Sequence, residues 1–164
     1  MNPFSIFGVE NLYRLSRSLY LRKYFRISKG IDSLNRMTNK CAVYGATDIG
    51  IGTQFAYGGI AVVIHKRAVI GKKCMIGQCC TIGRVPSNGR DTPEIGNNVY
   101  IGAGSKILGG VTIGDNSIIG PNAVITKNVD PFSVMVGVPG RLLTVINSEN
   151  IGRFSDYGVE QIDQ

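Results

Sequence analysis

The chain has 164 residues, a length typical of one domain, and its 43% hydrophobic content can supply a buried core. Its 22 glycines, with few prolines and no Gly-X-Y period, exclude collagen and indicate many tight corners. The net charge of +7 suits nucleic acid, an anionic membrane surface or a phosphorylated small molecule, and does not choose among them.

Residues 1–40 form the first segment and lack the repeat that follows. Leu12, Leu15 and Leu19 recur at helical spacing among arginines and lysines, which predicts a basic amphipathic helix. Such a helix could cap the fold that follows, or make a weak contact with a membrane surface. Because the start shows neither a signal-peptide pattern nor an apolar run of about 18 residues, we expect a cytoplasmic protein.

Residues 41–143 carry a repeat of six. An aliphatic residue is usually followed by glycine, and a small or β-branched residue comes four positions after it. The aliphatic positions are Ile64, Ile70, Ile76, Ile82, Ile95, Ile101, Ile107, Ile113, Ile119 and Ile125. The small positions are Ala68, Cys74, Cys80, Val99, Ser105, Val111, Ser117 and Ala123.

A period of six fits neither a helix nor a plain strand. One hexapeptide makes a short strand and a corner, and three make a triangular coil of about 18 residues that stacks on the next. The aliphatic side chain would fill the core, and glycine would stand where a Cβ crowds or φ is positive. The sequence therefore predicts an all-β, left-handed parallel β-helix, followed by a polar tail over residues 144–164.

The four cysteines have no spacing that indicates disulfides or a zinc site. Cys74 and Cys80 occupy small core positions, whereas Cys79 lies between repeat positions and is expected to face outward. We therefore expect reduced thiols and no metal.

Two interruptions of the repeat are expected to carry function. Between Ile82 and Ile95 the spacing is 13 residues instead of the 12 of two repeats, and the polar stretch over 84–94 predicts a protruding loop. The second interruption is the segment 55–59. Polar residues at these places are candidates for binding an acceptor: Tyr57, Arg84, Asn88 and Thr92.

The sequence IGNNVYIGAGSKILG at 95–109 and the sequence VGVPGR at 136–141 resemble the serine acetyltransferase-like branch of the hexapeptide-repeat acyltransferases. The resemblance covers about residues 44–143. It implies a homotrimer of parallel β-helices that binds acetyl-CoA in grooves between subunits. By position it implies a set of residues that bind acetyl-CoA: Gly102, Ala103, Gly120, Pro121, Gly137 and Arg141. Lys127 is a further candidate for the CoA phosphates, because they require a cation.

The chain departs from serine acetyltransferases where these have an Asp-His pair, because Ala56 and Tyr57 stand there. The second active-site histidine of that family falls near Thr92. The stretch from Tyr57 to His65 is more similar to members of this branch that act in polysaccharide and lipopolysaccharide biosynthesis. The resemblance therefore implies a sugar hydroxyl as acceptor, with serine as the alternative.

His65, the only histidine, occupies a corner position that glycine holds in most repeats, so its side chain is expected to point outward. An imidazole that titrates near neutral pH suits a general base that removes the acceptor's hydroxyl proton. Asp48, Asp91 or Glu94 could orient the ring, and the sequence does not rank them.

Three other functions fit the sequence less well. A carbonic anhydrase of this fold needs three histidines around each zinc, and one histidine per chain does not supply them. Nucleic-acid binding is disfavoured because the cations form no long patch with interleaved aromatics. A non-catalytic structural β-helix stays the alternative from another class, although it does not account for the exposed histidine.

Overall fold

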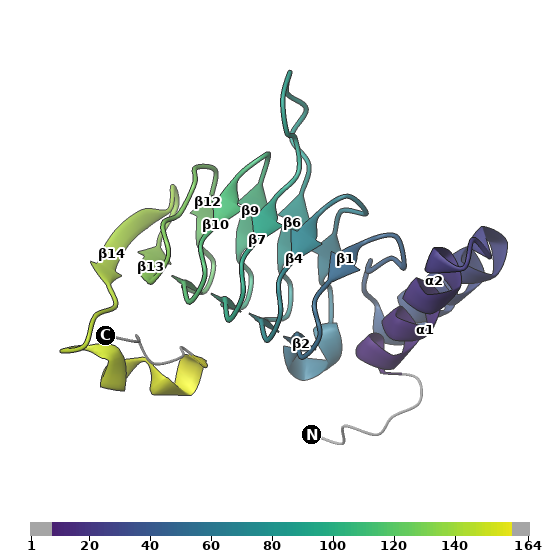
Figure 1. Cartoon of the computed structure of the whole chain (residues 1–164), viewed down its shortest axis with the longest axis horizontal. Helices are drawn as coiled ribbons and strands as arrows, with labels where there is room; N and C mark the ends of the chain where they lie inside the picture. Colours follow the sequence, from purple (N-terminus) through teal and green to yellow (C-terminus); the bar gives the residue numbers. More distant parts are fainter. Residues whose placement is uncertain (1–7, 159–164) are drawn as a thin grey trace.

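The computed structural model describes residues 8–158, and its main body is a parallel β-helix with three sheets (Figure 1). Sheet A contains β3 (Val63–Ile64), β6 (Thr81–Gly83), β9 (Lys106–Leu108) and β12 (Val124–Ile125). Sheet B contains β1 (Asp48–Ile49), β4 (Val69–Ile70), β7 (Glu94–Ile95) and β10 (Thr112–Ile113). Sheet C contains β2 (Gln54–Phe55), β5 (Met75–Ile76), β8 (Tyr100–Ile101), β11 (Ile118–Ile119), β13 (Ser133–Val136) and β14 (Arg141–Val145). The left-handed β-helix predicted from the period of six is confirmed.

The core is a column of isoleucines in register. Ile64 pairs with Ile82, which pairs with Ile107, and each lies one coil above the last. All ten predicted aliphatic positions are at most 2% exposed, and the predicted small positions, Cys74 and Cys80 among them, are buried beside them. The four cysteines are free thiols, and Cys79 is exposed as expected.

Two of the three edges of the coil carry residues selected from sequence. We call the edge between sheets A and B the A–B edge, and the edge between sheets C and A the C–A edge. The chain crosses the A–B edge at 65–68, 84–93, 109–111 and 126–128. It crosses the C–A edge at 56–62, 77–80, 102–105 and 120–123.

Crowding explains the corner glycines. A Cβ on Gly71 would collide with the carbonyl oxygen of Gly96 in the next coil, and one on Gly77 would lie 2.5 Å from the amide nitrogen of Ala103. Positive φ falls two residues later, at residues that include Asn98 and Asn122. Asparagine tolerates this left-handed conformation better than most residues, so the repeat carries a second signal that the glycine rule omits.

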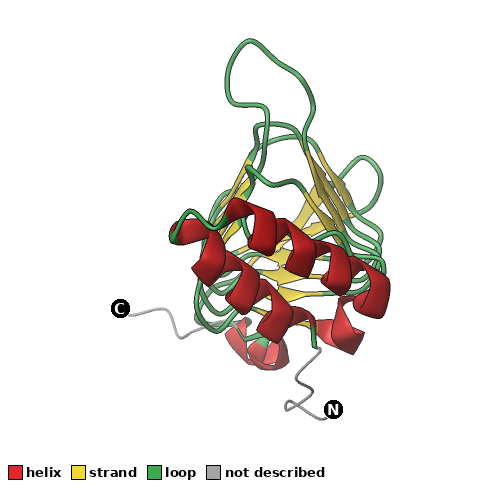
Figure 2. Ribbon diagram, turned by 90° about the vertical axis from the view of Figure 1, so that its right-hand side faces the viewer, coloured by secondary structure: helices red, strands yellow, loops and turns green. Residues whose placement is uncertain are grey.

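Two helices cover the first coil, rather than the single helix expected: α1 (Val9–Leu21) and α2 (Phe25–Asn39) (Figure 2). Val9, Leu12 and Tyr13 are buried, whereas Leu15 of the predicted stripe is about half exposed. The buried face of α1 is therefore rotated from the one that Leu12, Leu15 and Leu19 predicted, because Tyr13 and not Leu15 enters the core. Residues 1–7 of the predicted segment lie outside the described residues.

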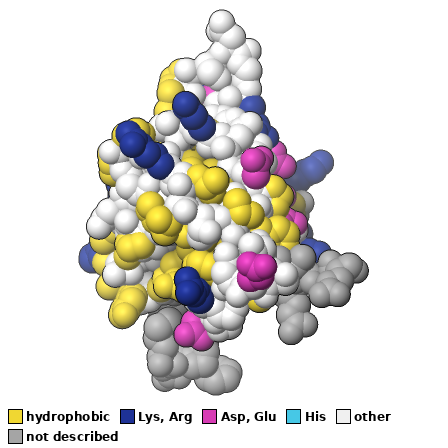
Figure 3. Space-filling view, turned by 90° about the vertical axis from the view of Figure 1, so that its left-hand side faces the viewer, with side chains coloured by type: hydrophobic (Ala, Val, Ile, Leu, Met, Phe, Trp, Pro, Cys, Tyr) yellow, Lys and Arg dark blue, Asp and Glu magenta, His cyan; other side chains and the backbone are white. Residues whose placement is uncertain are grey.

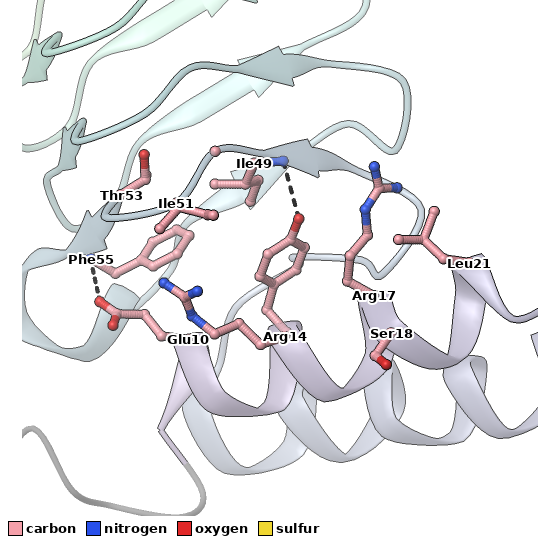
Figure 4. A pocket seen from close by; sticks show the side chains of 11 residues that line it. Glu10, Arg14, Arg17, Ser18, Leu21, Ile49, Ile51, Thr53 and Phe55 are labelled. Carbon is pink, nitrogen blue, oxygen red and sulfur yellow. Dashed lines mark hydrogen bonds between the residues drawn. The ribbon is translucent and has the colours of Figure 1, made fainter.

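Polar contacts fix α1 on the first coil (Figure 4). The Tyr13 hydroxyl donates to the carbonyl of Thr47 at 3.0 Å. It also accepts the N–H of Ile49 at 3.0 Å, the contact drawn in Figure 4. Glu10 accepts the N–H of Phe55 at 3.1 Å. The helices thus cover the end of the solenoid. Between residues 8 and 158, no helix is long and apolar enough to cross a bilayer.

The C-terminal segment is more structured than its polar composition indicated. β14 pairs antiparallel with β13, and two short 3₁₀ turns follow, η2 (Ile151–Arg153) and η3 (Ser155–Tyr157). Ile146 is buried against Ile118 and Val134 on the outer face of sheet C. Apolar side chains also gather on this end of the molecule (Figure 3), and the exposed ones near β14 are Val138, Leu142, Leu143 and Val145.

Candidate active site

His65 lies on the A–B edge, directly after β3, and its side chain is partly buried. Its N–H donates to the carbonyl of Ile82 at 2.8 Å, and its carbonyl accepts the N–H of Ala68 at 2.9 Å. The ring Nδ1 accepts the backbone N–H of Arg67 at 3.3 Å. The backbone is therefore fixed by the ladder, and the ring stands outside the isoleucine core.

A salt-bridge cluster lies beside His65. Asp91 accepts two hydrogen bonds of 2.8 Å from Nη2 of Arg67, one on each carboxylate oxygen. It also accepts one of 2.5 Å from Nε of Arg84. The Asp91 side chain is only 12% exposed, whereas the two arginines are about half exposed. One carboxylate thus orients two cations, so the cluster is positive overall.

None of the three carboxylates that could orient His65 is hydrogen-bonded to its ring within residues 8–158. Asp48 pairs with Arg17, and Glu94 pairs with Arg90. Asp91 faces the arginines described above. The sequence alone does not show which cation each carboxylate pairs with, because that depends on which side chains meet across coils.

Burial lowers the pKa of His65 below its ordinary 6.5, and the charges of Arg67 and Arg84 lower it further. Asp91 acts in the opposite direction but does not reverse the shift. The hydrogen bond from Arg84, with the one from Arg67, lowers the pKa of Asp91. At neutral pH the site therefore contains a neutral imidazole beside two guanidinium groups.

The predicted loop protrudes from the A–B edge between β6 and β7 (Figure 1). Its neck is closed by the N–H of Val85, which donates to the carbonyl of Asp91 at 3.0 Å. Arg90 holds the loop against the next coil through the carbonyl of Gly110 at 3.2 Å and the hydroxyl of Thr112 at 2.5 Å. Asn88 is exposed on the loop.

A cavity of about 530 Å³ lies between the loop and the following coils, lined by Arg90, Leu108 and Lys127 among others. Thr92 donates its hydroxyl to the carbonyl of Arg67 at 3.2 Å. The A–B edge therefore carries five residues selected from sequence: His65, Arg84, Asn88, Thr92 and Lys127.

The glycine-rich candidates for binding acetyl-CoA lie on the other side of sheet A, at or next to the C–A edge. A Cβ on Gly102 would lie 2.6 Å from the nitrogen of Pro121, and one on Gly120 would lie 2.9 Å from a methyl carbon of Val136. Ala103 stands beside Gly102 in the same corner. Close approach of the backbone of the next coil is thus enough to explain glycine at position 102, whereas at position 120 a Cβ would mainly meet the Val136 side chain.

Three further candidates lie apart from His65. Tyr57 belongs to the 3₁₀ turn η1 (Ala56–Gly59) on the C–A edge, where it has a left-handed conformation and is 70% exposed. Gly137 follows β13, and Arg141 begins β14. Tyr57 and His65 are near in sequence, but β3 separates them onto different edges. Sequence proximity was therefore a poor guide to which candidates share a site.

The described part of the chain contains no cluster of three or more His, Cys, Asp or Glu side chains arranged to bind a metal ion.

The residues that sequence reasoning missed at the site are Arg67 and the cluster around Asp91. One feature of the sequence could have identified Arg67, namely its position in the same corner as His65.

Comparison with known proteins supports the architecture. A family model described as "Bacterial transferase hexapeptide (six repeats)" matches residues 92–127. A Neisseria gonorrhoeae serine acetyltransferase in complex with serine is 26% identical, with a TM-score of 0.77, over 83% of this chain and 55% of that one. A soybean serine acetyltransferase complexed with serine is 30% identical, with a TM-score of 0.77, over 82% and 56%.

A serine acetyltransferase in complex with CoA is 26% identical, with a TM-score of 0.75, over 82% of this chain and 55% of that one. The chain thus spans little more than half the length of these structures. No curated protein matches the sequence.

Proposed function

Because the chain belongs to the serine acetyltransferase-like branch of the hexapeptide-repeat acyltransferases, we propose that it transfers an acetyl group from acetyl-CoA to the hydroxyl of a sugar. The observation that carries the proposal is the shared β-helix: a serine acetyltransferase of this architecture is known in complex with CoA. The four cysteines of this chain are free thiols, which favours a reducing compartment such as the cytoplasm.

The division of candidates between two edges favours a site made by two subunits. Within one protomer, sheet A separates His65 on the A–B edge from Gly102 and Pro121 on the C–A edge. A homotrimer in which the C–A edge of one copy faces the A–B edge of the next would unite them. Lys127 would then offer its charge to the phosphates of a donor that lies along the neighbouring copy.

In this proposal His65 is the general base. The acceptor oxygen attacks the thioester carbonyl, a C–O bond forms, the C–S bond breaks, and the hydroxyl proton passes through the imidazole to the CoA thiolate. The lowered pKa supports this role because the ring is neutral and able to accept a proton. For Nε2 to accept it, Nδ1 must carry the ring proton, so the contact with the Arg67 amide opens when the acceptor binds.

A sugar acceptor is favoured by the residues that replace the serine acetyltransferase pattern, Ala56, Tyr57 and Thr92. The polar side chains of Arg84 and Asn88 beside or on the loop suit an acceptor rich in hydroxyls. Serine is the second candidate, because two of the structural relatives were solved with serine. A structural β-helix without activity is the alternative from another class.

An acceptor screen tests the proposal. Purified protein is incubated with acetyl-CoA and either nucleotide sugars, oligosaccharides or serine, and the released CoA thiol is measured. We expect release with a carbohydrate and little with serine. Strong activity on serine would replace the sugar proposal, and the absence of acetyl-CoA binding in calorimetry would favour the structural alternative.

His65→Ala tests the role of the histidine. We expect turnover to fall at least about a hundredfold, as for loss of a general base, with acetyl-CoA binding and oligomeric state unchanged. Lys66→Ala is the matched control, because it removes a neighbouring exposed side chain from the same corner. Turnover in His65→Ala close to that of the control would exclude His65 as the base.

A further inference from the structure

We propose that the tip of the helical hairpin, residues Leu21–Ile27, docks on an anionic lipid bilayer and holds the end of the solenoid that the hairpin covers toward it. The tip joins α1 to α2 and is distinct from the residues assigned to acetyl transfer. That the docked protein acts on a lipid-linked acceptor rests on the proposed function; the docking itself does not.

The composition of the tip matches an anionic bilayer. All seven of its residues are exposed, and three are cations, Arg22, Lys23 and Arg26. The other four are apolar or aromatic: Leu21, Tyr24, Phe25 and Ile27. The sequence from residue 11 to 31 contains no aspartate or glutamate. Apolar and aromatic side chains flanked by cations are typical of segments that lie in the headgroup region.

The tip is an ordered turn and not an open loop. The N–H groups of Lys23 and Tyr24 donate to the carbonyls of Tyr20 and Leu19, each at 2.9 Å. The rings of Tyr20 and Phe25 meet edge to face, with centroids 5.2 Å apart. Because the turn is already fixed, binding does not have to order this part of the backbone.

The contacts of α1 show where the tip projects. Glu10, near the start of α1, contacts β2 in sheet C. One turn later Tyr13 reaches Thr47 and Ile49, and then Arg17 pairs with Asp48 at the start of β1. The helix thus crosses the first coil from sheet C toward the A–B edge, and the tip overhangs that edge.

The tip and the A–B edge share a surface. A cavity of about 620 Å³ lies between them, with Tyr20 and Phe25 on the hairpin side and Tyr44 and Lys66 on the edge. Lys66 adjoins His65. Arg67 and Arg84 farther along this edge pair with Asp91, so the charge available to the lipid is that of the tip and of Lys66 beside it.

A bilayer explains this surface better than a protein partner does. A seven-residue convex tip offers little area to a folded partner, whereas a headgroup layer admits short apolar projections to a depth of about 5–10 Å. Opposite charge supplies the second attraction, and two weak signals together give stable surface binding. The acceptor class that fits this orientation is a glycan attached to a lipid.

Co-sedimentation with vesicles tests the docking. The full chain is mixed with phosphatidylcholine vesicles made with or without phosphatidylglycerol. We expect binding only with phosphatidylglycerol, weakening as salt rises. The combined Arg22→Gln, Lys23→Gln and Arg26→Gln variant should bind about a hundredfold more weakly, since each cation near an anionic surface contributes about fivefold. Leu21→Ser with Ile27→Ser should also weaken binding.

The matched control removes three exposed cations elsewhere, by Lys40→Gln, Lys72→Gln and Arg153→Gln. Equal losses in the tip and control variants would overturn the proposal, because they would show delocalised charge attraction. Failure of the wild type to bind phosphatidylglycerol vesicles would overturn it as well. A change in the oligomeric state of the tip variants without vesicles would assign the tip to a protein interface instead.

Orientation is tested with a polarity-sensitive fluorophore. A label on Tyr24→Cys, in a chain that also carries Cys79→Ser, reports from the tip, and a label on Val145→Cys in the same background reports from the opposite end of the solenoid. We expect a shift to a less polar environment on vesicle binding only for the label at position 24. A shift at position 145 alone would overturn docking through the tip. Neither measurement uses acetyl-CoA, so failure of docking is separable from failure of the proposed activity.

Discussion

Replacing Gly102 by alanine separates the two reasons for a glycine at this corner. The added Cβ would lie 2.6 Å from the nitrogen of Pro121, about 0.8 Å closer than an ordinary 3.4 Å contact. Relief requires the two coils to move apart, which weakens the 2.7 Å hydrogen bond from the Gly102 N–H to the Ile119 carbonyl. Gly102→Ala should therefore destabilise the fold, whether or not Gly102 contacts acetyl-CoA.

The expected loss combines three effects. Overpacking of a closed site costs about 1–3 kcal/mol, and a weakened hydrogen bond about 0.5–1.5 kcal/mol. In the opposite direction, alanine lowers the conformational entropy of the unfolded chain, which stabilises the fold by about 0.4–1 kcal/mol. The net loss in the free energy of unfolding is about 2 kcal/mol, which corresponds to a Tm lower by about 4–8 °C for a chain of this length.

Thermal and urea unfolding of three matched variants check this reasoning. Gly71→Ala should lose a similar amount, because its Cβ meets the backbone of Gly96 and Asn97. Gly89→Ala on the loop should lose nothing, because no atom lies within 4 Å of its Cβ. If Gly102→Ala is as stable as Gly89→Ala but binds acetyl-CoA poorly, the crowding argument is wrong and the glycine serves the donor.

The His65 pKa and the left-handed corners give two more predictions. His65, the sole histidine, should titrate by NMR below 6.5, because burial and two guanidinium groups disfavour its charged form; Arg84→Gln should raise that pKa and Asp91→Asn should lower it. Because the folded-state pKa lies below the unfolded value, protonation of this histidine lowers the free energy of unfolding as pH falls below about 6.5. An NMR titration with a pKa above 6.5 would contradict the electrostatics described for the site. Cys79 has φ of +59°, so Cys79→Asn should raise the free energy of unfolding by up to about 1 kcal/mol, and an unchanged Tm would show that the corner carries no such strain.

The sequence determined the coil because a period of six leaves one inward side chain for each short strand. The spacing of Ile64, Ile70 and Ile76 therefore identified three sheets and their common core. The sequence also located the loop between Ile82 and Ile95, but the pattern indicated one surplus residue where the structure has seven: β6 leads directly to β7, so a step that normally takes six residues takes 13. A coil of fixed circumference has no room for the surplus, which forms the protruding loop. The basic first segment was identified as helical, although not as two helices.

Only the tertiary structure decided which of the selected residues share an edge. Tyr57 and His65 are eight positions apart in the sequence and yet lie on different edges, whereas Arg67 and Asp91 are 24 apart and form an ion pair. Side chains on the outside of a solenoid meet across coils, and the partner of each depends on loop length and side-chain conformation. A hexapeptide pattern constrains the inward residues by packing and leaves the outward residues, where the chemistry lies, to be fixed by those cross-coil contacts.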